Sequence, residues 1–300
     1  MKIDYFRGRA FRELFRLKNK YKQMKKIIVP VDFSEHSEYA LHVAAKLAKK
    51  YNAEILVLHM LEMSDIMLSA SDGLQYEKAA YFFKLSEQKF ETFLEKDYLK
   101  GVKVTPIIKH FKVFSEVNDV AQKNDADLIV MGSHGSSGVK EFFVGSNTER
   151  VVRNADIPVL VVKNRLEDIN FETVVFACDF SEESIKPYIN AIKMFNKMNS
   201  KVYMVYVNLP NERFKTSAEI EKSVVNFFAK ADRNLDRMSE VHYVSDYTVE
   251  AGIINFASKV GADIIAIPTH GKKGLAHFLE GSIGEDVANH AEFPVITFKI

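Results

Sequence analysis

The sequence predicts an α/β protein made of two consecutive copies of a five-stranded, parallel, doubly wound sheet. Three observations lead to this fold class. Short apolar segments alternate with helical patterns along the chain, the pattern restarts near residue 171, and 300 residues with 47% hydrophobic content suffice for two buried cores. Strands that alternate with helices at this spacing lie parallel and are joined by right-handed crossovers.

The first half opens with the apolar run IIVPV at 27–31, which ends at Asp32 and leads into a helix over 37–50 with its apolar residues on one side. A second strand follows at 54–60. After a polar, Ser-rich stretch, a long helix rich in Phe and Lys is expected over 75–98. The alternation continues with strands at 102–108, 127–131 and 157–163 and helices at 113–124 and 146–154.

The second half repeats the first. TVVFACDFSEES (173–184) parallels KIIVPVDFSEHS (26–37), NSKVYMVYV parallels NAEILVLHM, and ADIIAIPTHG parallels ADLIVMGSHG. The offset between the copies falls from 147 to 136 residues, so the second copy lacks eleven residues in its middle. The sequence therefore indicates a tandem duplication, with domains at 24–164 and 171–300 joined by a short linker.

Residues 1–23 form a basic extension ahead of the first domain. Residues 1–26 carry eight more Lys and Arg than Asp and Glu, so the remaining residues carry a net charge of −7 although the whole chain carries +1. We interpret 1–23 as a disordered extension or the product of a misplaced start codon. The alternative is a basic amphipathic helix that lies on an anionic membrane surface or docks onto a partner.

The composition excludes several classes of protein. The mildly acidic body argues against a nucleic-acid binder, which needs a basic face. No segment approaches eighteen uninterrupted apolar residues, so no transmembrane segment is expected. The single cysteine excludes an internal disulfide and the N-terminus lacks the apolar core of a signal peptide, so a cytoplasmic location is expected.

The loop GSHGSSGVKEFFVGS at 132–146 lies between an expected strand and an expected helix. Its glycines Gly132, Gly135 and Gly145 let the backbone approach a ligand, and the N–H groups of the helix that opens at Ser146 attract anions. A phosphate chain fits both features. A second interpretation needs no ligand, because Ser146 and Glu149 also match an S-x-x-E capping box. The two interpretations can hold together.

This loop, with the preceding DLIVMG and the following PVLVV, resembles the nucleotide loop of the universal stress protein family, and MKKIIVPVDFS resembles that family's usual start. The resemblance covers nearly all of 24–300. It implies two Rossmann-like domains of the adenine nucleotide alpha hydrolase-like type, and many members bind ATP at the carboxyl ends of the strands. That location agrees with the general rule for open α/β sheets.

Carried over by position, the resemblance implies one ATP site in the first half. Asp32 and the backbone at Met60 would contact adenine or ribose, and any Mg²⁺ would be held largely by the phosphates. For Asp32 an equal alternative is an N-cap of the following helix. The residues expected to hold the ribose and phosphates are Gly132, Ser133, Gly135, Gly145 and Ser146.

The second half departs from the pattern at its loop. Asp179, Gly271, Gly281 and Ser282 match, but Pro268 replaces the first loop glycine. Proline lacks an N–H and adds a ring where a ligand would approach, so a weak or empty second site is expected. The resemblance implies that the halves pair through their fifth strands, near 158–162 and 294–298, as a pseudo-dimer within the chain. Whether two chains then form a homodimer stays open.

Three functions compete. The first is a nucleotide-binding stress-response regulator that holds ATP in the first half and reports its occupancy to an unknown protein partner. The second is an ATP-independent interaction or scaffold protein, in which the loops are inherited architecture. The third is an enzyme of phosphoryl or adenylyl chemistry, which lacks an evident base or carboxylate pair near the loop. We therefore expect no enzyme, with slow ATP hydrolysis left open.

Overall fold

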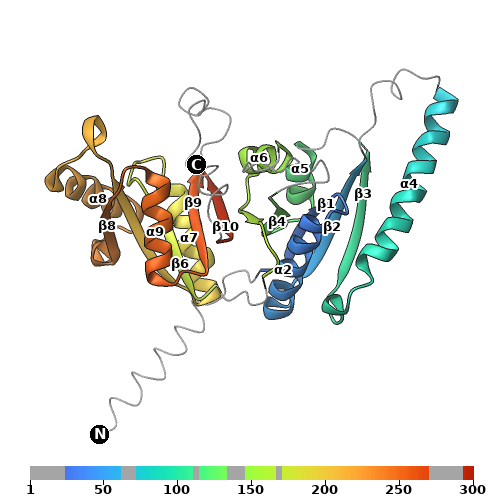
Figure 1. Cartoon of the computed structure of the whole chain (residues 1–300), viewed down its shortest axis with the longest axis horizontal. Coiled ribbons are helices and arrows are strands. Elements are labelled where there is room, and N and C mark those ends of the chain that lie inside the picture. The colour runs from blue at the N-terminus through green and yellow to red at the C-terminus, as the bar shows by residue number, and fades with distance from the viewer. Residues whose placement is uncertain (1–23, 62–71, 111–114, 134–145, 167–170, 270–292) are drawn as a thin grey trace, which may run out of the picture.

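A computed structural model describes residues 24–61, 72–110, 115–133, 146–166, 171–269 and 293–300. The described strands form one ten-stranded sheet in the order β3-β2-β1-β4-β5-β10-β9-β6-β7-β8. Figure 1 shows the first half, in blue and green, beside the second, in yellow to red. The two halves therefore share a single sheet.

The first half follows the predicted alternation. Its strands are β1 (Lys26–Val31), β2 (Glu54–Leu61), β3 (Val104–His110), β4 (Leu128–Gly132) and β5 (Val159–Val162). Its helices are α2 (Glu35–Tyr51), α4 (Asp72–Leu94), α5 (Ser115–Lys123) and α6 (Ser146–Asn154), with a 3₁₀ helix η1 (Asp97–Leu99). Most predicted boundaries are correct to within two or three residues.

The predicted end of the long helix at Tyr98 is wrong. Helix α4 ends at Leu94, and Lys96 is extended (φ −130°) before Tyr98 enters the short 3₁₀ helix η1. There the Tyr98 ring packs edge-on against His42 of α2, with ring centres 5.0 Å apart. Tertiary packing thus ends the helix where the local sequence would continue it.

The second half has the same plan as the first. Its strands are β6 (Thr173–Ala177), β7 (Lys201–Asn208), β8 (Val241–Ser245), β9 (Ile264–Thr269) and β10 (Val295–Lys299). Its described helices are α7 (Ile185–Met198), α8 (Ser217–Ala231) and α9 (Val249–Val260), with 3₁₀ helices η2 (Asn211–Arg213) and η3 (Asp236–Glu240). None of the helices in the described parts of the chain is long and apolar enough to cross a membrane.

All strand pairs within each half are parallel, as predicted, and the halves meet through the antiparallel pair β5–β10. Val161 lies opposite Val295, Leu160 opposite Ile296, and Val159 opposite Thr297. The expected fifth-strand pairing is therefore present within this chain. Because β5 and β10 run in opposite directions, the carboxyl ends of the strands lie on opposite edges of the sheet in the two halves.

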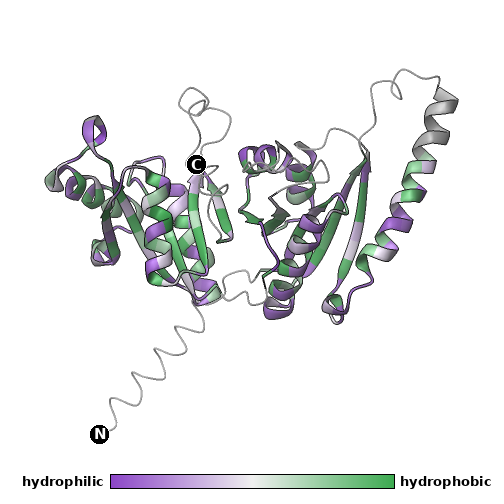
Figure 2. Ribbon diagram, in the orientation of Figure 1, coloured by the Kyte–Doolittle hydropathy of each residue, from purple (hydrophilic) through white to green (hydrophobic). Residues whose placement is uncertain are grey.

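Helices cover both faces of this sheet. One buried cluster runs across the seam and includes Leu160 and Val162 of β5 together with Ile296 and Phe298 of β10. Helices α2, α4, α7 and α8 contribute to this face. The opposite face has separate cores in each half, under α5 and α6 in the first and under α9 in the second. Figure 2 shows the apolar strands between more polar helix surfaces.

Lys299, in the last strand of the second half, adds polar contacts at the seam. Its ammonium lies 2.8 Å from Asp156 Oδ1 and donates to the Asn154 carbonyl, the last residue of α6, at 3.4 Å. The Asp156 carboxylate also accepts from the amides of Asn118 and Gln122, at 2.9 and 2.6 Å. These donors, led by Lys299, lower the pKa of Asp156.

We expect Lys299→Met to lower the free energy of unfolding by about 1 kcal/mol at pH 7, because it removes one half-exposed charged hydrogen-bond pair. Since the folded pKa of Asp156 is depressed, the stabilisation is present above the unfolded pKa of about 3.9 and is lost as the pH falls through the folded value. Urea unfolding at pH 7 and pH 3 should show the difference between variant and wild type shrinking in acid. A difference that grows in acid would contradict the assignment.

Candidate functional site

The sheet order brings three of the predicted site residues to one edge. Strand β1 lies between β2 and β4, and the chain winds outward through β2 and β3 on one side and through β4 and β5 on the other. The carboxyl ends of β1 and β4 thus flank a topological switch point, where open α/β sheets bind ligands. Asp32 follows β1, Met60 lies near the end of β2, and Gly132 ends β4.

The Asp32 carboxylate organises the turn between β1 and α2. Its Oδ1 atom accepts from the Ser34 N–H at 3.0 Å and from the Ser34 hydroxyl at 2.5 Å. Ser34, not Asp32, is the N-cap of α2, because its side chain accepts from the Ser37 N–H. The N-cap interpretation of Asp32 is therefore wrong. Its carboxylate makes an Asx turn, which fixes the carboxylate at the carboxyl end of β1, beside the switch point.

Between these two residues Phe33 adopts a left-handed backbone conformation, with φ of +64°. Such a conformation is costly for a bulky residue and is held only by surrounding structure. The Phe33 ring packs against His59, Phe90 and Phe93, at ring-centre distances of 4.4, 5.2 and 5.4 Å. Aromatic contacts to β2 and α4 thus hold the strained turn in place.

His59 connects this turn to the end of β2. Its Nδ1 lies 2.8 Å from the Val31 carbonyl, which fits an Nδ1–H donor. Burial, above all, lowers the pKa of His59, and the positive charge of Lys89 adds to the effect. The ring is therefore neutral at pH 7. The sequence offered one signal for this residue, its place at a strand end next to Met60.

The other two side chains at these strand ends are buried. Met60 is 9% exposed and its side chain packs in the core beneath α5 and α6, so a ligand contact of this residue through its backbone stays a prediction of the family resemblance. Met60 lies one residue past the last β1–β2 pair, Val31–His59. Ser133 is fully buried, and its N–H donates to the Val162 carbonyl at 2.9 Å.

Gly132 has a packing role that the sequence did not reveal. A Cβ atom at this position would lie 2.7 Å from the carbonyl oxygen of His36, in the first turn of α2. In addition, the Gly132 carbonyl accepts from the buried hydroxyl of Thr148, at 2.8 Å. Glycine therefore lets the first turn of α2 approach the end of β4, and its carbonyl also holds the first turn of α6.

Helix α6 begins at Ser146, as predicted, and Thr148 ties its first turn to β4. Glu149 forms an ion pair with Arg153 one turn later. The Ser146 side chain and the loop residues Gly135 and Gly145 lie outside the described residues, so the capping box and the loop contacts stay predictions. Within the described residues, no three His, Cys, Asp or Glu side chains gather as a metal site requires.

The second half repeats the turn but changes the helix start. Phe180 has φ of +54°, and Asp179 Oδ1 accepts from the Ser181 N–H at 3.0 Å and from the Ser184 hydroxyl at 2.7 Å. In the repeat Glu182 corresponds to the first residue of α2, but α7 begins only at Ile185. Pro268 carries a Cβ where Gly132 has none. The later helix start accompanies that bulkier residue.

Two parallel half-sheets, each with an Asp-Phe-Ser turn after its first strand, define a tandem α/β protein with a topological switch point in each half. The sequence pattern of the universal stress protein family matches residues 24–163 and 170–299. The chain therefore belongs to the universal stress protein family, as a tandem two-domain member.

Known proteins agree with this assignment. Universal stress protein MJ0577 of Methanocaldococcus jannaschii is 35% identical over 158 residues, covering 47% of this chain and 96% of that protein. Universal stress protein Slr1230 of Synechocystis is 23% identical over 304 residues, covering 92% of this chain and all of that protein. A crystal structure of a universal stress protein from Archaeoglobus fulgidus covers 94% of this chain and 98% of its own, with a TM-score of 0.62 and 23% identity, which shows the shared fold.

We expect Gly132→Ala to destabilise the protein by about 1–3 kcal/mol, because its Cβ would press on the His36 carbonyl and force a backbone shift. Pro268→Ala, at the corresponding position of the second half, is the matched control, since that position already carries a Cβ. Chemical unfolding measures both. Equal stability of Gly132→Ala and wild type would show that the loop, not packing, requires this glycine.

His59 should make the protein less stable in mild acid. Its folded pKa is lowered, so below the unfolded value of about 6.5 the unfolded chain binds the proton more tightly and stability falls with pH. His59→Asn keeps a donor for the Val31 carbonyl and cannot titrate. We expect the variant to lose less stability than wild type between pH 7.5 and pH 5. Parallel curves from thermal unfolding would refute the assignment.

Proposed function

We propose that this universal stress protein binds ATP in its first half, at the carboxyl ends of β1, β2 and β4. The observation that carries the proposal is the convergence of the Asp32 turn, the Met60 backbone and the end of β4, to which Thr148 ties the first turn of α6, at one switch point. The proposed binding residues are Asp32, Met60, Gly132, Ser133, Gly135, Gly145 and Ser146.

Each part of the nucleotide has a chemically suitable partner there. The Asp32 carboxylate can accept from the adenine amine or a ribose hydroxyl, and backbone groups at Met60 can meet the base edge. The first-turn N–H groups of α6 point toward the loop and favour the phosphates, and the loop glycines allow close approach. Mg²⁺ would arrive with the phosphates and be held mainly by them.

Two features support a regulator in which the second half acts mainly as the pairing partner. Pro268 replaces the first loop glycine there, and proline has no backbone N–H to donate to a ligand and brings a ring to that position. Strand β10 also completes the sheet of the first half through β5. In this proposal the halves keep one fold and divide the work, and the loops report nucleotide occupancy to a protein partner.

The alternative is an ATP-independent interaction protein. The full burial of Ser133 favours it, because a fully buried hydroxyl is not accessible to a ribose. Released nucleotide decides between the two. One sample of purified full-length protein is denatured, and the supernatant is analysed for released nucleotide. A second, nucleotide-free sample is titrated with ATP by calorimetry. One ATP per chain supports the proposal, and no binding supports the alternative.

The loop glycines provide the sharpest mutational test. Gly135→Val should reduce ATP binding below detection by calorimetry, because a branched side chain blocks the backbone approach, while circular dichroism shows an intact fold. Gly271→Val is the matched control at the corresponding position of the second half and should change little. A comparable loss from both variants would show that the second half also binds nucleotide.

A further inference from the structure

The second half has a cavity of about 380 Å³ far from the switch-point crevices. It lies at the amino ends of β7 and β8, between the end of α7 and the 3₁₀ helix η3. Asp179 and Pro268 mark the carboxyl ends of β6 and β9, on the opposite edge of the same half-sheet. Its volume is within the range of small-molecule sites, about 300–1,000 Å³. The cavity is therefore separate from the proposed nucleotide crevice.

A positive group is held at the wall of this cavity by buried structure. Arg237 Nε lies 4.0 Å from Asp232 Oδ2, and that oxygen accepts from the Tyr188 hydroxyl at 2.7 Å. Tyr188 is fully buried and the Arg237 side chain is 28% exposed. The guanidinium therefore lies at ion-pair distance from a carboxylate that is itself hydrogen-bonded to a buried tyrosine. Planar guanidinium groups bind carboxylates through two parallel hydrogen bonds.

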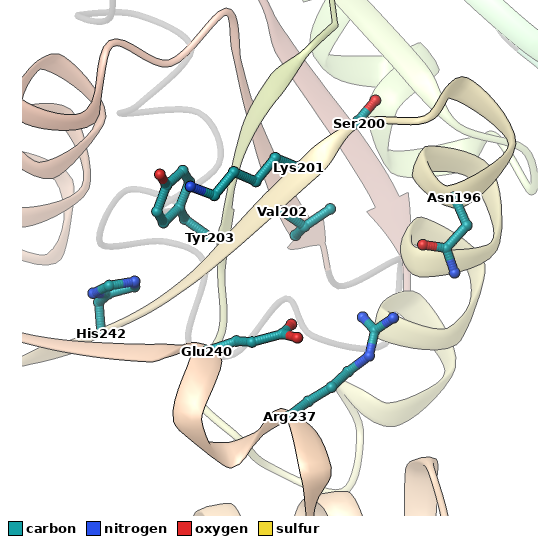
Figure 3. A pocket seen from close by; sticks show the side chains of 8 residues that line it. All are labelled: Asn196, Ser200, Lys201, Val202, Tyr203, Arg237, Glu240 and His242. Carbon is teal, nitrogen blue, oxygen red and sulfur yellow. The ribbon is translucent and has the colours of Figure 1, made fainter.

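A negative group faces the same space. Figure 3 shows Glu240 and Arg237 extending from η3 toward the region beside Val202, with the Asn196 amide approaching from α7. Among the described residues no ion pair joins Glu240 to Arg237 or to Lys201, the other permanent cation that lines the cavity. The two signs of charge are thus present and separate.

The first half has an ion pair at the corresponding place. Glu54 begins β2 as Lys201 begins β7. The Glu54 carboxylate lies 3.0 Å from Lys103 Nζ and accepts from the Thr105 hydroxyl at 2.8 Å, so the amino ends of β2 and β3 are joined. The second copy of the repeat lacks this bridge and has a hollow between opposite charges.

We propose that this cavity binds a small zwitterion of the α-amino-acid type. Its carboxylate pairs with the Arg237 guanidinium, and its ammonium group pairs with Glu240, while the Asn196 amide and Val202 contact the remainder. A simple anion would place a negative charge next to the Glu240 carboxylate. A simple amine would place a positive charge next to the Arg237 guanidinium. Only a ligand with both charges satisfies both walls.

The test uses the full-length protein and the twenty free L-α-amino acids as probes, screened by saturation-transfer NMR and quantified by calorimetry. The best ligand is then compared with its decarboxylated amine and its deaminated acid. Arg237→Gln and Glu240→Gln remove one wall charge each. Glu54→Gln is the matched control, because it alters the corresponding carboxylate region of the first half.

We expect at least one amino acid to bind. Its affinity should fall by a factor of about ten or more in Arg237→Gln and in Glu240→Gln, and should be unchanged in Glu54→Gln. The amine and the acid should bind more weakly than the parent. Glu240 is exposed, so its variant folds even if Arg237→Gln disturbs the Tyr188–Asp232 contact. Absence of binding by all twenty, equal binding by Glu240→Gln, or equal binding of the acid would each overturn the proposal.

Discussion

The antiparallel pairing of β5 with β10 is the constraint on which the rest of this structure depends. Both strands consist mainly of buried aliphatic residues, and without each other they would present two apolar edges with unpaired backbone groups. Their pairing makes one sheet of two, and the hydrophobic cluster beneath α2 and α7 runs across the seam without interruption. Because the pair is antiparallel, it also places the carboxyl ends of the strands of the two halves on opposite edges of the shared sheet.

Within that shared frame the two copies of the repeat differ at the ends of their strands. At the carboxyl ends, Gly132 admits the first turn of α2, whereas the second half has Pro268 at this position and a first helix that begins three residues later in the repeat. At the amino ends, the Glu54–Lys103 bridge of the first half has no counterpart around Lys201. The strands themselves keep their order and register. The two copies therefore differ mainly at the ends of their strands, and less in the strands whose side chains form the cores.

The periodicity of the sequence predicted the two half-sheets and their parallel strands, because buried strands and one-sided helices leave clear hydrophobic patterns. The family resemblance, and not the periodicity, predicted the pairing of the strands near residues 158–162 and 294–298. The periodicity was wrong at Tyr98, where contact with His42 overrides helix propensity. For Asp32 the sequence left a ligand contact and an N-cap as equal alternatives, and only the three-dimensional contacts show an Asx turn in place of the N-cap. The packing role of Gly132 and the strained Phe33 likewise depend on neighbours distant in sequence, which no local pattern reports.

A tandem chain also differs from a symmetric pair of subunits in how it responds to mutation. In a homodimer each substitution appears twice and must suit both copies of an isologous interface and both sites at once. Here β5 and β10 are encoded separately, so a change in one half is not copied into the other. One crevice can keep its glycine while the other accepts proline, and one corner can stay sealed while the other opens. Covalent linkage at the seam thus gives this protein two independently variable surfaces on one scaffold.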